Sequence, residues 1–152
     1  MTSNAGPIET ATARLRAAGL RATAPRVAVL AEVAAGPHLT VEQIATGARR
    51  RLGAISTQAV YDALGVLTGV GLVRRIEPAG SPTRYETRVG DNHHHVVCRS
   101  CGAIADIDCA VGDQPCLSPS DAEGFVIDEA EVTFWGLCPT CQAAREPEMK
   151  ES

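Results

Sequence analysis

The chain is poor in aromatic residues and in lysine. Aromatic side chains make up 3% of its 152 residues, so a core of Ala, Val, Leu and Ile must form without large rings. A small domain built in this way often relies on a bound metal for stability. Lysine is absent from residues 1–88, where every basic side chain is arginine. Arginine suits bidentate contacts to phosphate, although an ordinary solvated surface fits the same composition.

Long apolar runs are also missing. No stretch approaches 18 uninterrupted apolar residues, and the first residues lack a basic start followed by an apolar run. We therefore expect a cytoplasmic protein with no membrane partner. In that reducing compartment, six cysteines indicate metal ligands or redox thiols before structural disulfides.

Charge divides the chain into two parts. Residues 1–88 hold 11 Arg and 6 acidic residues, a net charge of +5, whereas residues 89–152 hold 3 basic and 12 acidic residues, a net charge of −9. This asymmetry predicts two modules. We expect a DNA-binding domain over residues 1–84, a hinge over 85–90, a metal-binding dimerisation domain over 91–145 and a disordered tail over 146–152.

Two Cys-x-x-Cys pairs are the strongest chemical signal. Cys98 and Cys101 form the first pair, and Cys138 and Cys141 form the second, with 36 residues between the two pairs. Each pair can bring two thiolates to one ion at about 2.3 Å, so two pairs complete a tetrahedral shell. The spacing predicts a structural Zn²⁺ site.

The basic part has the pattern of a winged helix-turn-helix. Apolar spacing and breakers predict helices over residues 9–18, 25–35, 40–52 and 56–69, followed by short strands over 72–77 and 83–86. Thr40 and Gln43 have the form of a capping box at the third helix. Together with the strands of the acidic part, this predicts an α+β protein.

The last of these helices carries the candidate DNA-contact surface. Its polar face holds Thr57, Gln58 and Tyr61, opposite an apolar stripe. In a major groove, Gln58 can read adenine and Tyr61 can reach a phosphate or a thymine methyl group. Arg26 and Ser56 complete the expected set of DNA contacts. The alternative is a helical bundle whose polar face meets only water.

The acidic part predicts a second metal site. Strands over residues 93–98 and 103–108 would form an antiparallel hairpin, with His93 and His95 on one face and His94 on the other. The register would bring Asp106 near His95, which makes a mixed nitrogen and oxygen site.

A short helix ending at Gly124 and a long strand over residues 125–137 would complete a small sheet. Its uncovered apolar surface and edges favour pairing with a second copy. Cys109 and Cys116 are either small buried hydrophobes or a redox pair.

These motifs resemble the ferric uptake regulator family over about residues 12–142. The matching segments are Gly19–Arg26, His38, Gln58–Tyr61, Arg84–Glu86 and His93–Gly102. The resemblance implies a homodimeric, metal-dependent repressor that binds AT-rich inverted repeats in double-stranded DNA. It also implies a regulatory metal site at the hinge, formed by His38, Glu86, His93, His95 and Asp106.

Nitrogen and oxygen donors suit Fe²⁺ or Mn²⁺ at that site, although Zn²⁺ would bind more tightly and can substitute in the purified protein. The family's auxiliary metal site is not expected, because this chain has Asn92, His94 and Ala130 at the corresponding positions.

The runs 89–95, 108–112 and 115–117 are most similar to the actinobacterial branch of the family that represses catalase-peroxidase genes. This similarity implies derepression by peroxide at the protein's own promoter and at a catalase-peroxidase gene. Oxidation of His38 or His93, or of thiols, could provide the switch.

Three other functions are consistent with parts of the pattern. An iron- or zinc-uptake regulator would share the architecture and differ in the signal. A zinc hydrolase using the three histidines is disfavoured because adjacent histidines on a strand diverge and no partnered nucleophile is present. We therefore expect no enzymatic activity and no small-molecule substrate. A zinc-ribbon interaction module would show no salt-dependent operator binding.

Overall fold

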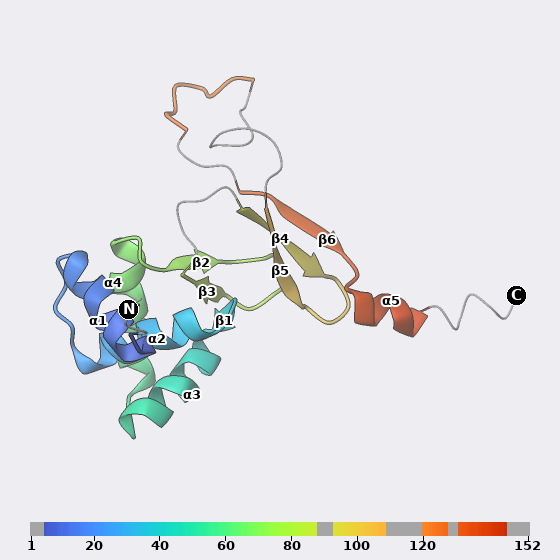
Figure 1. Cartoon of the computed structure of the whole chain (residues 1–152). Helices are drawn as coiled ribbons and strands as arrows, with labels where there is room; N and C mark the ends of the chain where they lie inside the picture. Colours follow the sequence, from blue (N-terminus) through green and yellow to red (C-terminus); the bar gives the residue numbers. More distant parts are fainter. Residues whose placement is uncertain (1–4, 88–92, 109–119, 128–130, 146–152) are drawn as a thin grey trace, which may run out of the picture. The chain divides into compact units, whose positions relative to one another are not determined.

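The structure is a computed structural model that describes residues 5–87, 93–108, 120–127 and 131–145 (Figure 1). The chain divides into two compact units, Met1–Val89 and Gly90–Ser152. Among the described residues, no helix has both the length and the apolar character needed to span a membrane.

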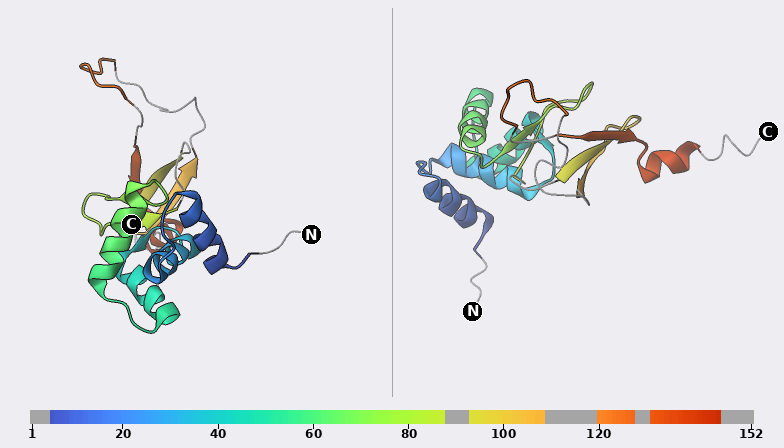
Figure 2. Two further views of the ribbon diagram at one scale, coloured as in Figure 1. Left: turned by 90° about the vertical axis from the view of Figure 1, so that its left-hand side faces the viewer. Right: turned by 90° about the horizontal axis from the view of Figure 1, so that it is seen from above.

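The first unit is a helical domain with a small sheet. Its elements are α1 (Pro7–Ala17), α2 (Ala24–Ala35), β1 (Leu39–Thr40), α3 (Val41–Leu52), α4 (Thr57–Gly69), β2 (Arg74–Ile76) and β3 (Arg84–Glu86). Helix α2 packs against α1, α3 and α4, as the views in Figures 1 and 2 show. Six of its twelve residues are buried, so α2 forms the centre of the aliphatic core.

Side-chain caps define where the helices begin. The Thr40 hydroxyl accepts a hydrogen bond from the Gln43 backbone N–H at 3.3 Å, and the Gln43 side chain accepts one from the Thr40 N–H at 2.9 Å. This confirms the predicted capping box of α3. Ser56 caps α4 by accepting from the Ala59 N–H at 3.1 Å. Gly53, with φ of +81°, ends α3 in the left-handed conformation that favours glycine.

The first sheet has the order β1-β3-β2, and both pairings are antiparallel. The two predicted strands of the wing are confirmed with shorter bounds. Strand β1 was not predicted, because two residues are too few to produce an alternating pattern. Its pairing of Leu39 with Tyr85 connects the start of α3 to the wing.

The second unit contains β4 (His93–Cys98), β5 (Ile104–Asp108), β6 (Thr133–Gly136) and α5 (Pro139–Arg145). The strand order is β5-β4-β6, with β4 and β5 antiparallel and β4 and β6 parallel. His95 lies opposite Asp106, which confirms the predicted register of the hairpin.

Two expectations for this unit were wrong, and one helix was missed. Of the long strand expected over residues 125–137, the described residues 125–127, 131–132 and 137 are not in a strand, whereas Thr133–Gly136 is. The described part of the short helix, residues 120–124, has a turn instead, because Glu123 and Gly124 both have positive φ. Helix α5 was missed because none of its seven residues is buried, so it shows no apolar stripe.

Candidate metal centres and nucleic-acid interface

Cys98 and Cys101 flank a tight turn that the backbone maintains. The Cys98 N–H donates to the Ala103 carbonyl at 2.8 Å, and the Gly102 N–H donates to the Cys98 carbonyl at 3.0 Å. Gly102 has a φ of +76°, which a side chain would make unfavourable. This geometry turns the end of β4 back toward β5 and leaves the two thiols close together.

The second pair of cysteines follows β6. Cys138 directly precedes α5 and Cys141 lies in its first turn. The Arg99 N–H donates to the Gly136 carbonyl at 2.8 Å, so the turn between the first two cysteines is tied to the end of β6. Parallel pairing of β4 with β6 therefore brings the two pairs together.

All four thiols are free, and their sulfur atoms lie within 4.8 Å of one another. The Sγ atoms of Cys101 and Cys138 are 3.7 Å apart. A tetrahedral zinc site with Zn–S bonds of about 2.3 Å has sulfur atoms separated by roughly 3.8 Å. The residues therefore fit zinc in both chemistry and spacing.

Two of the four thiols have shifted pKa values. Hydrogen bonding from the Cys101 backbone, with further backbone hydrogen bonds from Cys138 and Ser100, lowers the pKa of Cys98 to about 6. The pKa of Cys141 is raised to about 11. A hydrogen bond with Ser100 lowers it, but the neighbouring thiols, Cys138 foremost, and burial together raise it more. Cys98 is thus readily available to a cation as a thiolate, whereas the neighbouring thiols favour the protonated form of Cys141.

His38 and Glu86 form a buried pair in the first unit. The Nε2 of His38 lies 3.2 Å from Oε2 of Glu86, and each residue is only 3% exposed. Pairing of β1 with β3 brings them together, since His38 directly precedes β1 and Glu86 ends β3. His38 has a φ of 55°, and Arg84 donates to its carbonyl oxygen at 3.0 Å. A non-glycine residue in this conformation is uncommon, and Arg84 helps to hold it there.

His95 and Asp106 form a comparable pair in the second unit. Nε2 of His95 lies 3.3 Å from Oδ1 of Asp106, and His95 is 1% exposed. The antiparallel register of β4 and β5 produces this contact. His93 lies opposite Asp108 in the same ladder, and its side chain is outside the described residues. Cys109 and Cys116 are also outside them.

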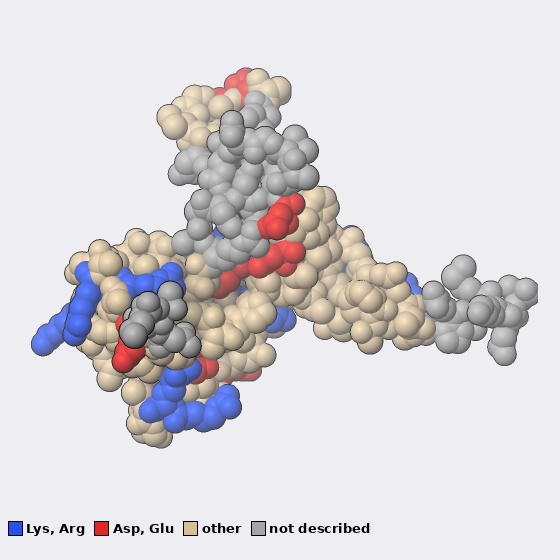
Figure 3. Space-filling view, viewed as in Figure 1, with Lys and Arg blue, Asp and Glu red and all other residues tan. Residues whose placement is uncertain are grey.

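The candidate DNA-contact residues are exposed on one face of α4. Thr57, Gln58 and Tyr61 all face solvent, and Tyr61 is 50% exposed. Their opposite face is buried in the core. Arginine side chains are visible over this unit in Figure 3. Arg26 is half-buried, and its guanidinium donates to the Arg21 carbonyl at 3.2 Å.

Sequence reasoning missed Arg49. Its Nε donates to the Ile55 carbonyl at 3.3 Å, and its Nη2 donates to the Thr57 hydroxyl at 3.2 Å. These bonds connect the last turn of α3 to the first residue of α4. The run Arg49–Arg51 was visible in the sequence, but three adjacent arginines at a helix end do not show which one faces the next helix.

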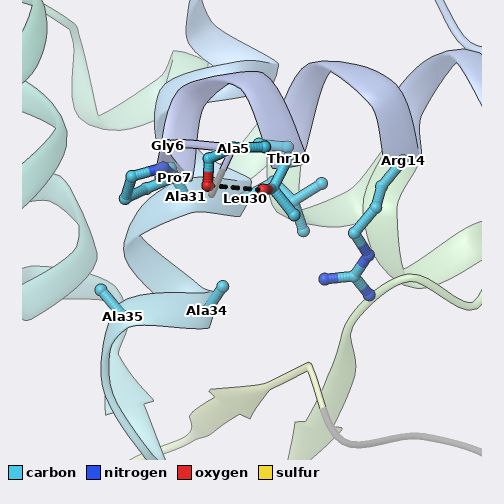
Figure 4. A pocket seen from close by; sticks show the side chains of 10 residues that line it. Ala5, Gly6, Pro7, Thr10, Arg14, Leu30, Ala31, Ala34 and Ala35 are labelled. Carbon is cyan, nitrogen blue, oxygen red and sulfur yellow. Dashed lines mark hydrogen bonds between the residues drawn. The ribbon is translucent and has the colours of Figure 1, made fainter. Parts of the chain in front are cut away.

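A cavity of about 400 Å³ lies between α1 and α2 (Figure 4). Half of its lining residues are alanine, and Arg14 points into the space beside Leu30. None of the ten lining residues is His, Cys, Asp or Glu. The cavity therefore offers no metal ligands and no catalytic pair. It differs in this from the histidine–carboxylate pairs and the four-cysteine cluster described above.

A winged-helix unit followed by a small sheet with a four-cysteine cluster defines the chain as having the fold of metal-binding transcriptional regulators. The sequence profile described as "Ferric uptake regulator family" matches residues 17–135. The chain belongs to that family, whose members are transcriptional regulators and not enzymes.

Several relatives are similar over most of their length. The transcriptional regulator FurA of Mycobacterium tuberculosis is 62% identical over 128 residues, which cover 84% of this chain and 87% of the relative. Ferric uptake regulation protein 1 of Mycolicibacterium fortuitum is 58% identical, covering 88% and 83%. The peroxide-responsive repressor PerR of Staphylococcus epidermidis is 26% identical, covering 89% and 90%.

Solved structures share the fold. The ferric uptake regulator of Helicobacter pylori, described as having three functional metal-binding sites, superimposes with a TM-score of 0.67 at 23% identity, covering 93% of this chain and 97% of that one. A zinc uptake regulator complexed with zinc and DNA has a TM-score of 0.62 at 18% identity, covering 91% and 94%.

Proposed function

We propose that this protein is a metal-dependent homodimeric repressor that binds AT-rich inverted repeats and is released from them by peroxide. The regulated genes would be its own and a catalase-peroxidase gene. The observation that carries the proposal is the imidazole–carboxylate pair in each compact unit. His38 and Glu86 are both buried, whereas buried His95 pairs with the exposed Asp106. Each unit thus offers half of a nitrogen and oxygen donor set.

The regulatory metal would be held by both halves. His38 and Glu86 would contribute from the first unit, and His93, His95 and Asp106 from the second. Such donors suit Fe²⁺ or Mn²⁺. A ligand that needs both units favours the arrangement in which they are held together, so metal supply would control the population able to bind DNA.

This site can be tested without DNA. His38→Ala should reduce the Mn²⁺ bound per chain while leaving the zinc content unchanged, because zinc would occupy the four-cysteine cluster. Glu86→Gln should also reduce the Mn²⁺ bound per chain. Glu77→Gln is the matched control, since its carboxylate pairs with Arg75 at the surface. Equal Mn²⁺ binding by the wild type and His38→Ala would refute the assignment.

Zinc at Cys98, Cys101, Cys138 and Cys141 would be structural. Among the described residues of the second unit few apolar side chains are buried, of which Val97 is one, so this part of the unit shows no large core. Four zinc–sulfur bonds would connect the end of β4 to β6 and α5. Zinc would then contribute directly to the folding free energy of the unit.

DNA would be bound through α4 and its surroundings. We expect contacts from Arg26, Ser56, Thr57, Gln58 and Tyr61. Support comes from the exposure of Thr57, Gln58 and Tyr61 on one face of the helix. If the protein contacts six to ten phosphates, raising the salt concentration from roughly 50 to 200 mM would reduce its affinity for DNA by a factor of about 10³ to 10⁵.

A second copy would cover the apolar face of the second unit. Phe134 on β6 is 49% exposed and Ile107 on β5 is 38% exposed, and the register of the strands places both on one face of the sheet. Trp135, on the opposite face, is 37% exposed. Large aromatic side chains left exposed on a small sheet indicate an interface. A dimer would also match an inverted repeat, because both have twofold symmetry.

Peroxide sensing is supported by the runs around residues 89–95 and 108–117, and more weakly by the similarity to the PerR repressor. Two chemistries are compatible with it. With Fe²⁺ bound, the imidazole of His38 or His93 could gain oxygen. Alternatively, thiols could oxidise to a disulfide, either Cys98 with Cys101, which would release zinc, or Cys109 with Cys116, which would not.

One binding experiment separates these possibilities. Zinc-replete protein loaded with Fe²⁺ or Mn²⁺ is bound to DNA from upstream of its own gene, before and after micromolar peroxide. Release of the iron form alone would support oxidation at the regulatory site, and release of both forms would support thiols.

Release only by a chelator would favour an uptake regulator that senses metal supply. That second candidate is supported by the name of the M. fortuitum relative. In that case the peroxide proposal would be wrong.

A further inference from the structure

The exposed face of α4 contains an internal hydrogen bond. Nε2 of Gln58 donates to Oδ1 of Asp62 at 2.8 Å, and both residues are exposed. They are four positions apart, which places them one above the other on the same face of the helix. Tyr61 lies beside them and is also exposed. The bond therefore lies within the surface that would face DNA.

Asp62 is the only charged residue of α4. A carboxylate on a helix that faces DNA is repelled by the phosphates, so it lowers the affinity for every sequence alike. An Asn or Ala at this position would avoid that repulsion. The Asp62 carboxylate is therefore best explained by a role in base recognition.

The hydrogen bond determines which way the Gln58 amide faces. With one N–H donated to Asp62, the amide keeps one further N–H donor and its carbonyl acceptor. These two groups are the complement of adenine in the major groove, which presents an acceptor at N7 and a donor at N6. A reversed amide would place its carbonyl oxygen against the carboxylate, and two acceptors cannot share a hydrogen bond.

The carboxylate also disfavours the competing purine. Guanine presents two acceptors, N7 and O6, at the same edge of the major groove. A nearby carboxylate repels such an edge, whereas the N6 amino group of adenine or the N4 amino group of cytosine is attracted to it. Asp62 would therefore act both through Gln58 and directly against guanine.

We propose that Asp62 determines base specificity by orienting the Gln58 amide toward adenine and by rejecting guanine. This inference rests on the proposed DNA-binding function. Asp62 would reduce the affinity for all DNA slightly and increase the preference for one base pair in each half-site.

The test uses full-length, zinc-replete, Mn²⁺-loaded protein. Its affinity is measured by fluorescence anisotropy for the duplex upstream of its own gene. The affinity is measured in the same way for duplexes in which single A·T pairs are changed to G·C, and for a duplex of random sequence. The variants are Asp62→Ala, Asp62→Asn, Gln58→Ala and the double variant. Thr68→Ala, another exposed residue of α4, is the control.

We expect Asp62→Ala to lose about tenfold in discrimination at one A·T position per half-site, in line with one bidentate base contact. Its affinity for the random duplex should be equal or higher, because a negative charge is removed. Asp62→Asn keeps a side-chain acceptor but loses the charge and gains N–H donors that can pair with a reversed Gln58 amide. It should therefore lose part of the discrimination, while binding random DNA as Asp62→Ala does. The double variant should discriminate less than Gln58→Ala alone, because the direct repulsion of guanine is also lost. Its loss should still be smaller than the sum of the two single losses, because both single changes remove the Gln58 contact.

Two results would overturn the inference. If Asp62→Ala weakens binding to all duplexes alike, the residue only supports the helix. If discrimination is unchanged at every position, Asp62 does not determine specificity. Thermal melting of each variant verifies that the helix is intact. Wild-type protein that does not prefer its upstream duplex over the random one would instead overturn the proposed function, and this inference with it.

Discussion

The guanidinium of Arg99 lies 5.4 Å from the centre of the Trp135 ring. The same residue donates its backbone N–H to the Gly136 carbonyl. Arg99 lies between Cys98 and Cys101, and Trp135 lies in β6 just before Cys138. A cation–π contact and a backbone hydrogen bond thus join the two halves of the cysteine cluster.

This contact makes Trp135 a reporter of zinc occupancy. Removing zinc should loosen the turn around Arg99 and expose the indole to water, so the emission should shift to longer wavelength. Trp135 is the only tryptophan, so the signal needs no deconvolution. A chelator titration measures it, and added zinc should restore the emission. Arg99→Ala should shift the emission before any chelator is added. Unchanged emission after complete zinc release would contradict the expectation.

The thiol pKa values predict how the metal-free protein responds to pH. For Cys98, the folded pKa of about 6 lies below the usual 9.0, so its stabilisation is complete above pH 9 and is lost as pH falls through 6. For Cys141, the folded pKa of about 11 lies above 9.0, so its stabilisation is complete below pH 9 and is lost as pH rises through 11. Melting temperatures of chelated protein should therefore peak near pH 9.

Cys141→Ser tests the alkaline side of this profile. It should remove the decline of the melting temperature between pH 9 and 11 and keep the rise between pH 6 and 9. A melting temperature that does not change between pH 6 and 9 in the chelated wild type would show that Cys98 has no such role.

Gly47 should not tolerate a side chain. A Cβ atom there would lie 1.9 Å from a carboxylate oxygen of Glu32, which forms an ion pair with Arg51 at 2.5 Å. Gly47→Ala should destabilise the protein by about 1–3 kcal/mol, because the Glu32 side chain must move from its present position and give up its ion pair with Arg51. Thermal or denaturant unfolding measures the change.

Gly65→Ala is the matched control, since a Cβ at Gly65 would meet nothing within 4 Å. It should stabilise α4 by about 0.5–1 kcal/mol, because glycine is unfavourable within a helix. Equal effects at the two positions would rule out the steric explanation.

Arg49 should position α4 for DNA. Arg49→Met removes the hydrogen bonds to the Ile55 carbonyl and the Thr57 hydroxyl. Operator binding should weaken by about 1–3 kcal/mol, the value of two hydrogen bonds. Arg50→Met removes the same charge from the adjacent exposed residue and should cost less. If both variants lose the same affinity at every salt concentration, Arg49 contributes only its charge.

Phe134 should contribute to the interface between two copies. Phe134→Ser removes an exposed aromatic side chain from β6, so it should shift the chain from dimer to monomer at low micromolar concentration. Light scattering coupled to size exclusion measures the mass. Zinc content serves as the control, because an intact cysteine cluster shows that the unit is folded. A variant that remains dimeric would place the interface elsewhere.

Local patterns were enough to predict several features. Thr40 and Gln43 predicted the start of α3, because a capping box needs only residues three positions apart. The opposition of His95 and Asp106 followed from the period of two in a strand and one tight turn. Conversely, the prediction of a strand over residues 125–137 was wrong, because an imperfect alternation does not show how many residues of a segment pair with a neighbouring strand. Of the described residues in that stretch, Thr133–Gly136 forms the strand that pairs with β4.

The sequence by itself determined the family, the four thiols of the proposed zinc site and the polar face of α4, because each depends on residue types in a local pattern. The family resemblance grouped His38 with Glu86, but only the tertiary structure shows how they meet and that Arg84 donates to the His38 carbonyl across 46 residues. Pairing of the two-residue strand β1 with β3 produces both contacts. Two residues have too little periodicity to be recognised along the chain, and their partners become neighbours only when the core of α2, α3 and α4 has formed.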